Sequence, residues 1–410
     1  MADLGFWAIV VIVTVTYVGI ALGKVPVFRA NRTTIALIGV GALLGAGLLS
    51  FEQLSDFLEL NTLILLFGMM ILNANLQLAG FFRLAGSGIL RFTKSPRSLL
   101  ALVILVSGVL SALFLNDTIC LMLTPLVIDI VKTAKRNPLP YLIALATAAN
   151  IGSTATLTGN PQNMIIGISS GISYLDFALN LTPIALLGLG SVWLVLVLLY
   201  RDEFKRGTFE RLDLPRPRVY RPLLVKSLFV TLGLLIGFMF GVPIAEAAFI
   251  AASVLLLTRR VRPEKVLNEI DWNLLVFFGA LFILTGVIEA NHLTDGIFNA
   301  IRPYIDRSAV SLSAVTVVMS NLLSNVPAVL LMRPLVTGLP NAVSGWLTLA
   351  MASTLAGNLT LLGSVANLIV AESAAKRGIH LTFGEYTKAG ALITLLSLGI
   401  GVVWMQVFIW

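Results

Sequence analysis

Residues 147–167 read TAANIGSTATLTGNPQNMIIG, and residues 351–371 read MASTLAGNLTLLGSVANLIVA. The two stretches align without a gap, and six of their 21 positions are identical. The identical pairs include Thr156 with Thr360, Gly159 with Gly363, and Asn163 with Asn367. Each stretch places glycine, asparagine, serine and threonine in the middle of a long apolar segment. Shared interruptions at corresponding positions indicate an internal repeat.

A second pair of similar stretches precedes the first pair in the same order. Residues 111–127 (SALFLNDTICLMLTPLV) align with residues 320–336 (SNLLSNVPAVLLMRPLV), and seven of 17 positions match, including Asn116 with Asn325. Apolar sequences often match by chance, so neither alignment is persuasive alone. Because both occur in the same order, we interpret the chain as two repeats, each with a helical hairpin followed by a broken helix.

The composition places most of the surface in lipid. Of 410 residues, 58% are hydrophobic and only 12% are charged, and the mean hydropathy is +0.96. Soluble proteins are typically about 45–50% apolar and about 25% charged. This difference excludes soluble enzymes and nucleic-acid binders. One cysteine, Cys120, excludes a disulfide framework, and no ATP-binding or metal-ligand spacing occurs, so we expect neither a metal nor another cofactor.

The apolar segments predict an all-α integral membrane protein. A membrane-spanning helix needs about 20 apolar residues. Twelve segments approach or exceed this length: 6–23, 34–50, 60–82, 99–131, 139–171, 177–200, 222–240, 244–258, 273–290, 309–338, 345–374 and 389–410. Four of them are unusually long and contain the interruptions described above. With two of the long segments folded as hairpins, we expect about ten transmembrane helices in two repeats of inverted topology.

The basic residues predict the orientation of the chain. If the N-terminus lies outside and both 99–131 and 309–338 return to the side they came from, loops on the inside carry 24 Lys and Arg and loops on the outside carry two. This distribution obeys the positive-inside rule and explains the sequence pI of about 9.8 without a nucleic-acid partner. We therefore expect a multi-pass protein of the plasma (cell inner) membrane. The hairpins open to opposite sides, so the repeats are inverted.

These features predict four parts of the chain. Residues 1–33 form an N-terminal transmembrane helix, 34–200 the first inverted repeat, 201–221 a basic cytoplasmic linker, and 222–410 the second repeat with a leading helix. Surrounding lipid is an expected partner.

The interruptions predict helix ends in the middle of the membrane. In the first repeat a helix stops at Gly159, and the next begins with Asn160 as its N-cap, followed by proline. Gly363 and Ser364 offer the same stop and cap in the second repeat. Broken helices at membrane depth line cavities, where helix N-termini bind anions and helix C-termini bind cations. The alternative is that these residues only kink scaffold helices.

Asp117 is the one acidic residue deep in an apolar stretch. Ionisable groups at mid-membrane are expensive and usually functional, and burial shifts the pKa of a carboxyl group toward neutrality. We therefore predict that Asp117 couples transport to protons, the alternative being a structural hydrogen bond.

Arg333 is the only basic residue well inside a hairpin. It could pair with a carboxylate or an anion, but we favour a position near the outer interface.

Four motifs resemble the ion transporter superfamily, which includes citrate transporter-like proteins. They are FLNDT (114–118), ANIGSTATLTGNPQN (149–163), SNVP (324–327) and AGNLTLLGSVANLIVAE (356–372). The branch with arsenite permeases and plant silicic-acid efflux transporters is the most similar. The resemblance implies inverted repeats meeting at a central site, a homodimer and elevator-like movement. The implied binding residues are Asn116, Asp117 and Thr118 at the first tip, Ser324 and Asn325 at the second, and Thr156, Gly159, Asn160, Asn163, Thr360, Gly363, Ser364 and Asn367 at the breaks.

The predicted lining suits a small neutral inorganic solute. Sodium-coupled dicarboxylate relatives carry Ser-Asn-Thr at both tips, whereas this chain carries Asn-Asp-Thr and Ser-Asn-Val. Amides and hydroxyls, Gln162 among them, with one acid and no basic residue at the tips, favour polyhydroxyl solutes such as arsenous or silicic acid over multivalent anions. Proton influx through Asp117 would drive export, with Na⁺ as the other possible coupling ion. The alternatives are a di- or tricarboxylate carrier coupled to Na⁺ or H⁺, a sodium/proton antiporter, a channel and, least of all, a membrane enzyme.

Overall fold

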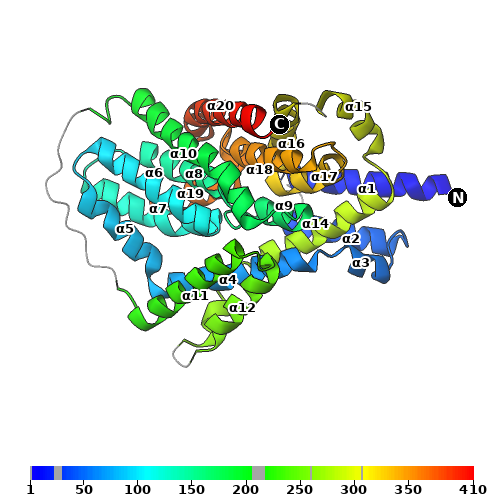
Figure 1. Ribbon diagram of the computed structural model, residues 1–410, viewed down its shortest axis with the longest axis horizontal. Helices are drawn as coiled ribbons and strands as arrows, with labels where there is room; N and C mark the ends of the chain where they lie inside the picture. The colour runs from blue at the N-terminus through cyan, green and yellow to red at the C-terminus, as the bar shows by residue number, and fades with distance from the viewer. Residues whose placement is uncertain (1, 23–29, 206–217, 259–260, 306–307) are drawn as a thin grey trace.

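A computed structural model describes residues 2–22, 30–205, 218–258, 261–305 and 308–410 (Figure 1). Within these ranges the chain forms α-helices and one short 3-10 helix, with no strand. The first ten helices are α1 (Ala2–Leu22), α2 (Arg32–Gly45), α3 (Phe51–Phe57), α4 (Leu60–Ala79), α5 (Phe81–Phe92), α6 (Pro96–Leu113), α7 (Asn116–Thr133), α8 (Pro138–Ser153), α9 (Pro161–Ser170) and α10 (Tyr174–Leu199). The remaining elements are α11 (Arg221–Met239), α12 (Ile244–Leu256), α13 (Pro263–Leu267), α14 (Trp272–Ala290), α15 (Asp295–Ile305), α16 (Ala309–Leu323), α17 (Asn325–Thr337), α18 (Ala342–Ala356), the 3-10 helix η1 (Leu361–Gly363), α19 (Val365–Ala375) and α20 (Phe383–Phe408).

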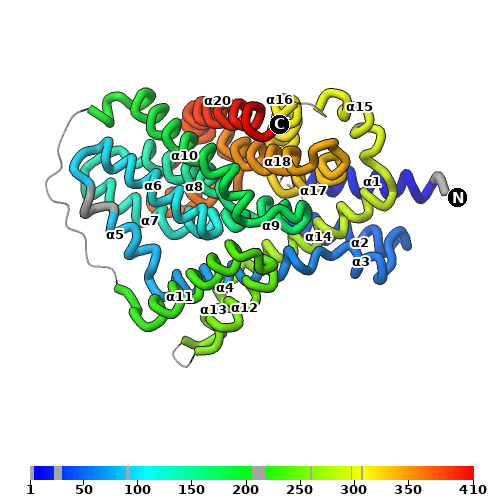
Figure 2. Tube along the Cα trace, in the orientation of Figure 1, coloured from blue at the N-terminus to red at the C-terminus, as the bar shows by residue number. Residues whose placement is uncertain are grey.

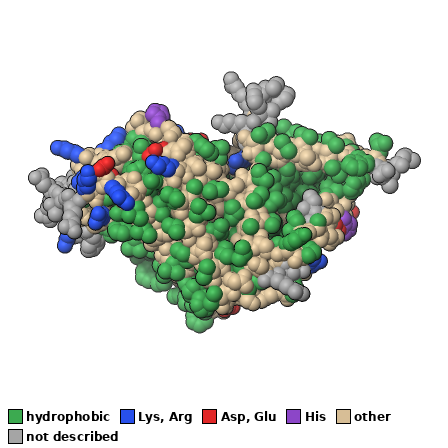
Figure 3. Space-filling model, turned by 90° about the horizontal axis from the view of Figure 1, so that it is seen from above, with side chains coloured by type: hydrophobic (Ala, Val, Ile, Leu, Met, Phe, Trp, Pro, Cys, Tyr) green, Lys and Arg blue, Asp and Glu red, His purple; other side chains and the backbone are tan. Residues whose placement is uncertain are grey.

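The expected all-α membrane protein is confirmed. Seven of the described helices are long and apolar enough to cross a membrane, and six shorter apolar helices of 10–17 residues accompany them. Large apolar side chains are exposed along many helices, and Figure 3 shows them covering much of the visible face. Figure 3 shows Lys and Arg gathered instead at one end of the molecule, on its left, which is also the left of Figure 1. We call this the basic end; α1 begins at the opposite end.

Each of the four long apolar segments is divided into two helices. Segments 99–131 and 309–338 form the hairpins α6–α7 and α16–α17, whereas 139–171 and 345–374 form the broken helices α8–α9 and α18–α19. A capping box at Ser95 and a proline in the first turn start α6. At the second tip Ser324 turns the chain with φ +81, which is unusual for a residue with a side chain.

The two hairpins point toward each other from opposite ends of the molecule. The open end of α6–α7 lies at the basic end, where Lys132 Nζ donates to the carbonyl of Arg377. The open end of α16–α17 lies at the far end beside α15, where Arg302 donates to the carbonyl of Gly338. The two hairpins therefore enter the molecule from opposite ends.

The helices divide into two groups. The hairpins and broken helices pack with α10 and α20, and α6 and α8 approach so closely that a Cβ on Gly152 would overlap the backbone of Gly108. Helices α2, α4, α12 and α14 pack chiefly on one another or on α1 and α11, and α4, α11 and α12 run together along the lower side of Figure 2. Of the predicted linker 201–221, residues 206–217 lie outside the described residues.

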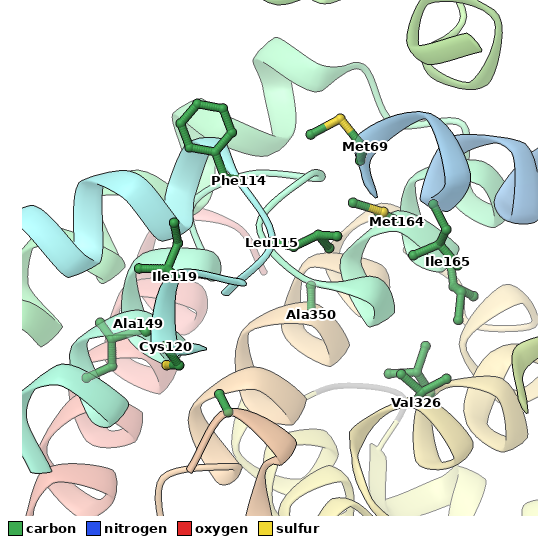
Figure 4. Packing of buried hydrophobic residues seen from close by; sticks show 14 of the residues in the cluster. Met69, Phe114, Leu115, Ile119, Cys120, Ala149, Met164, Ile165, Val326 and Ala350 are labelled. Carbon is green, nitrogen blue, oxygen red and sulfur yellow. The ribbon is translucent and has the colours of Figure 1, made fainter. Parts of the chain in front are cut away.

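Buried apolar side chains surround the first tip in the interior of the molecule. Figure 4 shows Leu115 of the tip between Met69 of α4 and Ala350 of α18, with Met164 of α9 close by. All four side chains are at most 4% exposed. This packing fixes the tip among elements from both helix groups.

Candidate functional site

The break between α8 and α9 is built by two asparagines. Asn160 lies just before α9, and its Oδ1 accepts the backbone N–H of Asn163 at 2.8 Å, as an N-cap does. Asn163 Nδ2 donates to the carbonyls of Ser153 and Thr156, both at 3.0 Å. These bonds satisfy carbonyls that the end of α8 leaves without helical partners. Gly159 passes so close to Ser153 that an added Cβ would overlap its carbonyl oxygen.

The break between α18 and α19 repeats this geometry at the aligned positions. Asn367 Nδ2 donates to the carbonyl of Gly357 at 2.8 Å and to that of Thr360 at 3.1 Å. Ser364 Oγ caps α19 by accepting the N–H of Ala366 at 3.3 Å. Because the same side chain closes the same two turns in both halves, the sequence alignment corresponds to a structural one.

The first tip is tied to the break in its own repeat. The backbone N–H of Asn116 donates to the carbonyl of Gly159 at 3.0 Å, and Asn116 Nδ2 donates to Asn150 Oδ1 at 3.0 Å. Thr156 donates to the carbonyl of Ala112 in α6. The first hairpin is thereby held at its end.

Asn150 of α8 joins both repeats. Its Nδ2 donates to Asn358 Oδ1 at 2.9 Å and to Asn367 Oδ1 at 3.0 Å, and its Oδ1 accepts from Ser364 Oγ at 3.1 Å. The aligned residue of α18, Thr354, accepts from Asn160 Nδ2 at 3.2 Å and from Gln162 Nε2 at 3.3 Å. Each broken helix therefore binds the break of the other repeat.

We expect Gly159→Ala to destabilise the protein because its Cβ meets backbone that cannot rotate away. Overpacking of this kind costs about 1–3 kcal/mol. Gly190→Ala in α10 is the matched control, since nothing lies within 4 Å of its added Cβ. Thermal unfolding in detergent should show a lower midpoint for the first variant only; an equal midpoint in both would contradict the close approach.

A cavity of about 200 Å³ lies where the hairpin tips meet the breaks. We call it the tip cavity. Its walls come from the starts of six helices, α2, α7, α9, α14, α17 and α19. Helix N-termini carry free N–H groups and partial positive charge, so their convergence favours solute oxygen atoms. The lining residues are Arg32, Thr33, Asn116, Asp117, Pro161, Gln162, Asp271, Asn273, Leu274, Phe277, Phe278, Ser324, Asn325, Val326, Pro327, Ser364 and Val365.

Five of the thirteen residues expected at the site line the tip cavity: Asn116, Asp117, Ser324, Asn325 and Ser364. The other eight do not line it. Thr118 is the third residue of α7, where its Oγ1 accepts from Asn73 Nδ2 at 3.4 Å. The remaining seven form the two breaks: Thr156, Gly159, Asn160, Asn163, Thr360, Gly363 and Asn367. They shape the cavity by fixing its helix ends.

Asn150, Arg32 and Asp271 are among the residues of the site that sequence reasoning missed. Asn150 carried a signal, since it is a polar residue in the otherwise apolar first half of a broken helix, and it is only 2% exposed. Arg32 and Asp271 start α2 and α14, outside the aligned repeats, and nothing in their sequence context pointed to the tips. The tips themselves carry one acid and no basic residue, but the cavity also contains this second acid and an arginine.

Two polar groups at the cavity have no protein partner among the described residues. Arg32 is half-buried and forms no ion pair with the described part of the chain. Asn325 Oδ1 is buried with no hydrogen-bond donor within reach in those same ranges. A solute in the cavity could therefore bind to Arg32 without displacing an ion pair with the described residues, whereas the side chain of Asn325 would first have to turn its Oδ1 toward the cavity.

The family model for citrate transporters matches residues 17–356. The chain belongs to this family. It is a secondary transporter of the citrate and arsenite permease type, and its relatives are transporters. The silicon efflux transporter LSI3 of Oryza sativa subsp. japonica is 31% identical, with 92% of this chain and 93% of LSI3 covered. The transporter arsB of Dictyostelium discoideum, named as putative, is 26% identical over 97% of this chain and 91% of its own length.

Solved structures confirm the fold of this transporter. The YdaH transporter of Alcanivorax borkumensis superposes with a TM-score of 0.64 at 15% identity, covering 99% of this chain and 97% of YdaH. MtrF of Neisseria gonorrhoeae, described as illuminating a class of antimetabolite efflux pumps, gives a TM-score of 0.59 at 9% identity, covering 98% and 94%. Both likenesses concern the fold alone.

Proposed function

We propose that this transporter exports a small neutral metalloid hydroxide, such as arsenous or silicic acid, or a related anion, in exchange for protons. The observation that carries the proposal is the tip cavity, where six helix N-termini surround amides and one hairpin carboxylate. The similarity to a silicon efflux transporter and to an arsB protein supports the same solute class.

The lining offers both hydrogen-bond donors and acceptors to a polyhydroxyl solute. Gln162, Asn116 and the helix N-termini supply N–H donors toward the oxygen atoms of the solute. Asn325 Oδ1 has no partner in the described ranges and, once its side chain turns toward the cavity, can accept from a solute hydroxyl. A hydroxide with several O–H groups can use both kinds of group at once.

Asp117 is the group that we propose to exchange the proton. It starts α7 at the first tip and lines the tip cavity, so its carboxyl group faces the same space as the solute. If the proton and the solute occupy the same small cavity in turn, the transporter can carry protons in one direction and the solute in the other. The basic end then faces the cytoplasm and the N-terminus the outside, as the positive-inside rule requires. The plasma membrane is the proposed location.

Carboxylate transport is the second candidate, and Arg32 favours it. A guanidinium can bind a carboxylate through two parallel hydrogen bonds, and the convergent helix N-termini also attract anions. The family model is named for citrate transport. Arg32→Gln would abolish binding of a carboxylate but leave binding of a neutral hydroxide nearly unchanged.

Transport in proteoliposomes distinguishes these functions. We expect uptake of arsenite or germanic acid, a mimic of silicic acid, to follow an imposed pH gradient, to saturate with concentration and to be insensitive to a sodium gradient. The Arg32→Gln variant should retain this uptake. Citrate uptake that is lost in Arg32→Gln would instead establish the second candidate, and flux that does not saturate would contradict a carrier.

A further inference from the structure

Arg333 of α17 lies between two carboxylates. Its Nη1 is 2.5 Å from Glu59 Oε1, and its Nη2 and Nε lie 3.0 and 3.2 Å from the two oxygens of Glu289. The arginine side chain is 23% exposed and both glutamates are 30% exposed. The geometry to Glu289 is the two-bond arrangement that makes arginine–carboxylate pairs strong and directional. We call Arg333, Glu59 and Glu289 the ion-pair cluster.

The cluster connects the two groups of helices. Arg333 belongs to the second hairpin, and α17 packs mainly on α16, α18 and α9. Glu59 precedes α4, and Glu289 lies near the end of α14, both in the other group. The ion pair of Arg377 with Asp129, at 2.6 Å, differs in that it joins α19 to α7 within one group. Of these two arginine pairs, only the one at Arg333 links a hairpin to the helix group that contains α4 and α14.

The ion-pair cluster lies along the contact between α14 and α17, further from the starts of these helices than the tip cavity. Phe278 and Val326 line the tip cavity, whereas one turn further along the same helices Phe282 and Leu330 line a second cavity of about 430 Å³ that contains the cluster. One helical turn is about 5.4 Å. In the turn between these two pairs of lining residues, Leu281 of α14 and Val329 of α17 are both buried, each 0% exposed.

The tip cavity reaches the surface on the side away from the ion-pair cluster. Asp271 and Asn273, at the start of α14, are exposed and line it, while Glu289 lies near the other end of that helix. A helix of 19 residues is about 28 Å long. The side of the tip cavity that faces the ion-pair cluster is closed, and the side at the start of α14 is open.

We propose that Arg333 is a positioning residue of the transport cycle, holding the second hairpin against α4 and α14 so that the tip cavity is closed toward the N-terminal end. This inference rests on the proposed function, in which the cavity opens alternately to the two sides. The ion pairs form in the state described here and must break before the cavity opens toward that end. Removal of the arginine would also leave two half-buried carboxylates facing each other, which disfavours the closed state.

Cysteine accessibility tests the proposal without knowledge of the solute. A reporter cysteine, Val326→Cys, is placed at the tip cavity in a Cys120→Ala background, and a membrane-impermeant maleimide is added at the side of the N-terminus. We expect slow labelling with Arg333 present and labelling about tenfold faster in Arg333→Gln, since about tenfold corresponds to an ordinary shift between two states. Arg333→Lys, which keeps the charge, should restore part of the slow labelling.

Arg377→Gln is the matched control because it breaks an arginine–carboxylate pair that does not join the two groups. Unchanged labelling in Arg333→Gln, or an equal increase in Arg377→Gln, would overturn the proposal. If Arg333→Gln does not fold, Glu289→Gln removes the two-bond partner and should also speed labelling. If none of the tested solutes is transported but labelling is faster in Arg333→Gln, only the proposed function is rejected. If transport is normal but labelling in Arg333→Gln is unchanged, only the role of Arg333 is rejected.

Discussion

Asp117→Asn should reduce uptake driven by a pH gradient to the level of empty liposomes. The amide keeps the size of the carboxyl group and still forms hydrogen bonds, but it cannot exchange a proton at physiological pH. The backbone N–H of Asp117 donates to Asn116 Oδ1 at 3.0 Å, and this bond does not depend on the carboxyl group. The tip should therefore keep its shape while the coupling is lost.

The measurement for this variant compares two kinds of flux. Gradient-driven uptake reports coupling, while exchange of solute across a membrane without a pH gradient reports binding and movement. We expect the first to disappear and the second to persist. Asp271→Asn is the matched control, since this acid lines the same tip cavity but belongs to the start of α14. Coupling that survives in Asp117→Asn, or is lost only in Asp271→Asn, would show that Asp117 does not carry the proton.

Asn150→Leu should have the largest effect on stability. Leucine has a similar volume but removes the side-chain hydrogen bond of Asn150 to Asn116 and the three bonds that join the two repeats. Each buried polar partner left unsatisfied costs about 1–3 kcal/mol, so the total loss should reach several kcal/mol. We expect a large decrease in the thermal midpoint and no measurable transport.

The matched control for Asn150 is Asn180→Leu. Asn180 also lies in an apolar helix, but its Nδ2 donates only within α10, to the carbonyl of Asp176 at 2.7 Å. This substitution should change the midpoint little. Similar midpoints for the two variants would mean that the contacts of Asn150 between the repeats contribute no stability.

The polar residues that interrupt the long apolar segments predicted the hairpins and broken helices of the fold. Glycine, asparagine and proline in apolar segments are rare enough that two similar sets in the same order indicate broken helices, and Gly159 and Gly363 do lie in the breaks. The length of segments 99–131 and 309–338 indicated hairpins by the same reasoning. These features are local, so they can be recognised without knowledge of contacts between distant residues.

The composition of the tip cavity could not be predicted in the same way. Arg32 and Asp271 reach the cavity because α2 and α14 happen to start beside the tips, which depends on the packing of helices outside the repeats. Arg32 lies between the apolar segments 6–23 and 34–50, and basic residues are expected in such loops for topological reasons alone. For that reason the sequence favoured a lining without a cation, whereas the structure adds one.

The two tips differ in how they are held. Asn116 donates to the break of its own repeat and to Asn150, whereas Asn325 Oδ1 has no donor within reach in the described ranges, and Ser324 beside it holds a positive φ. The two aligned tips are therefore held by different contacts. We therefore expect the second tip, rather than the first, to move when a solute is enclosed in the tip cavity.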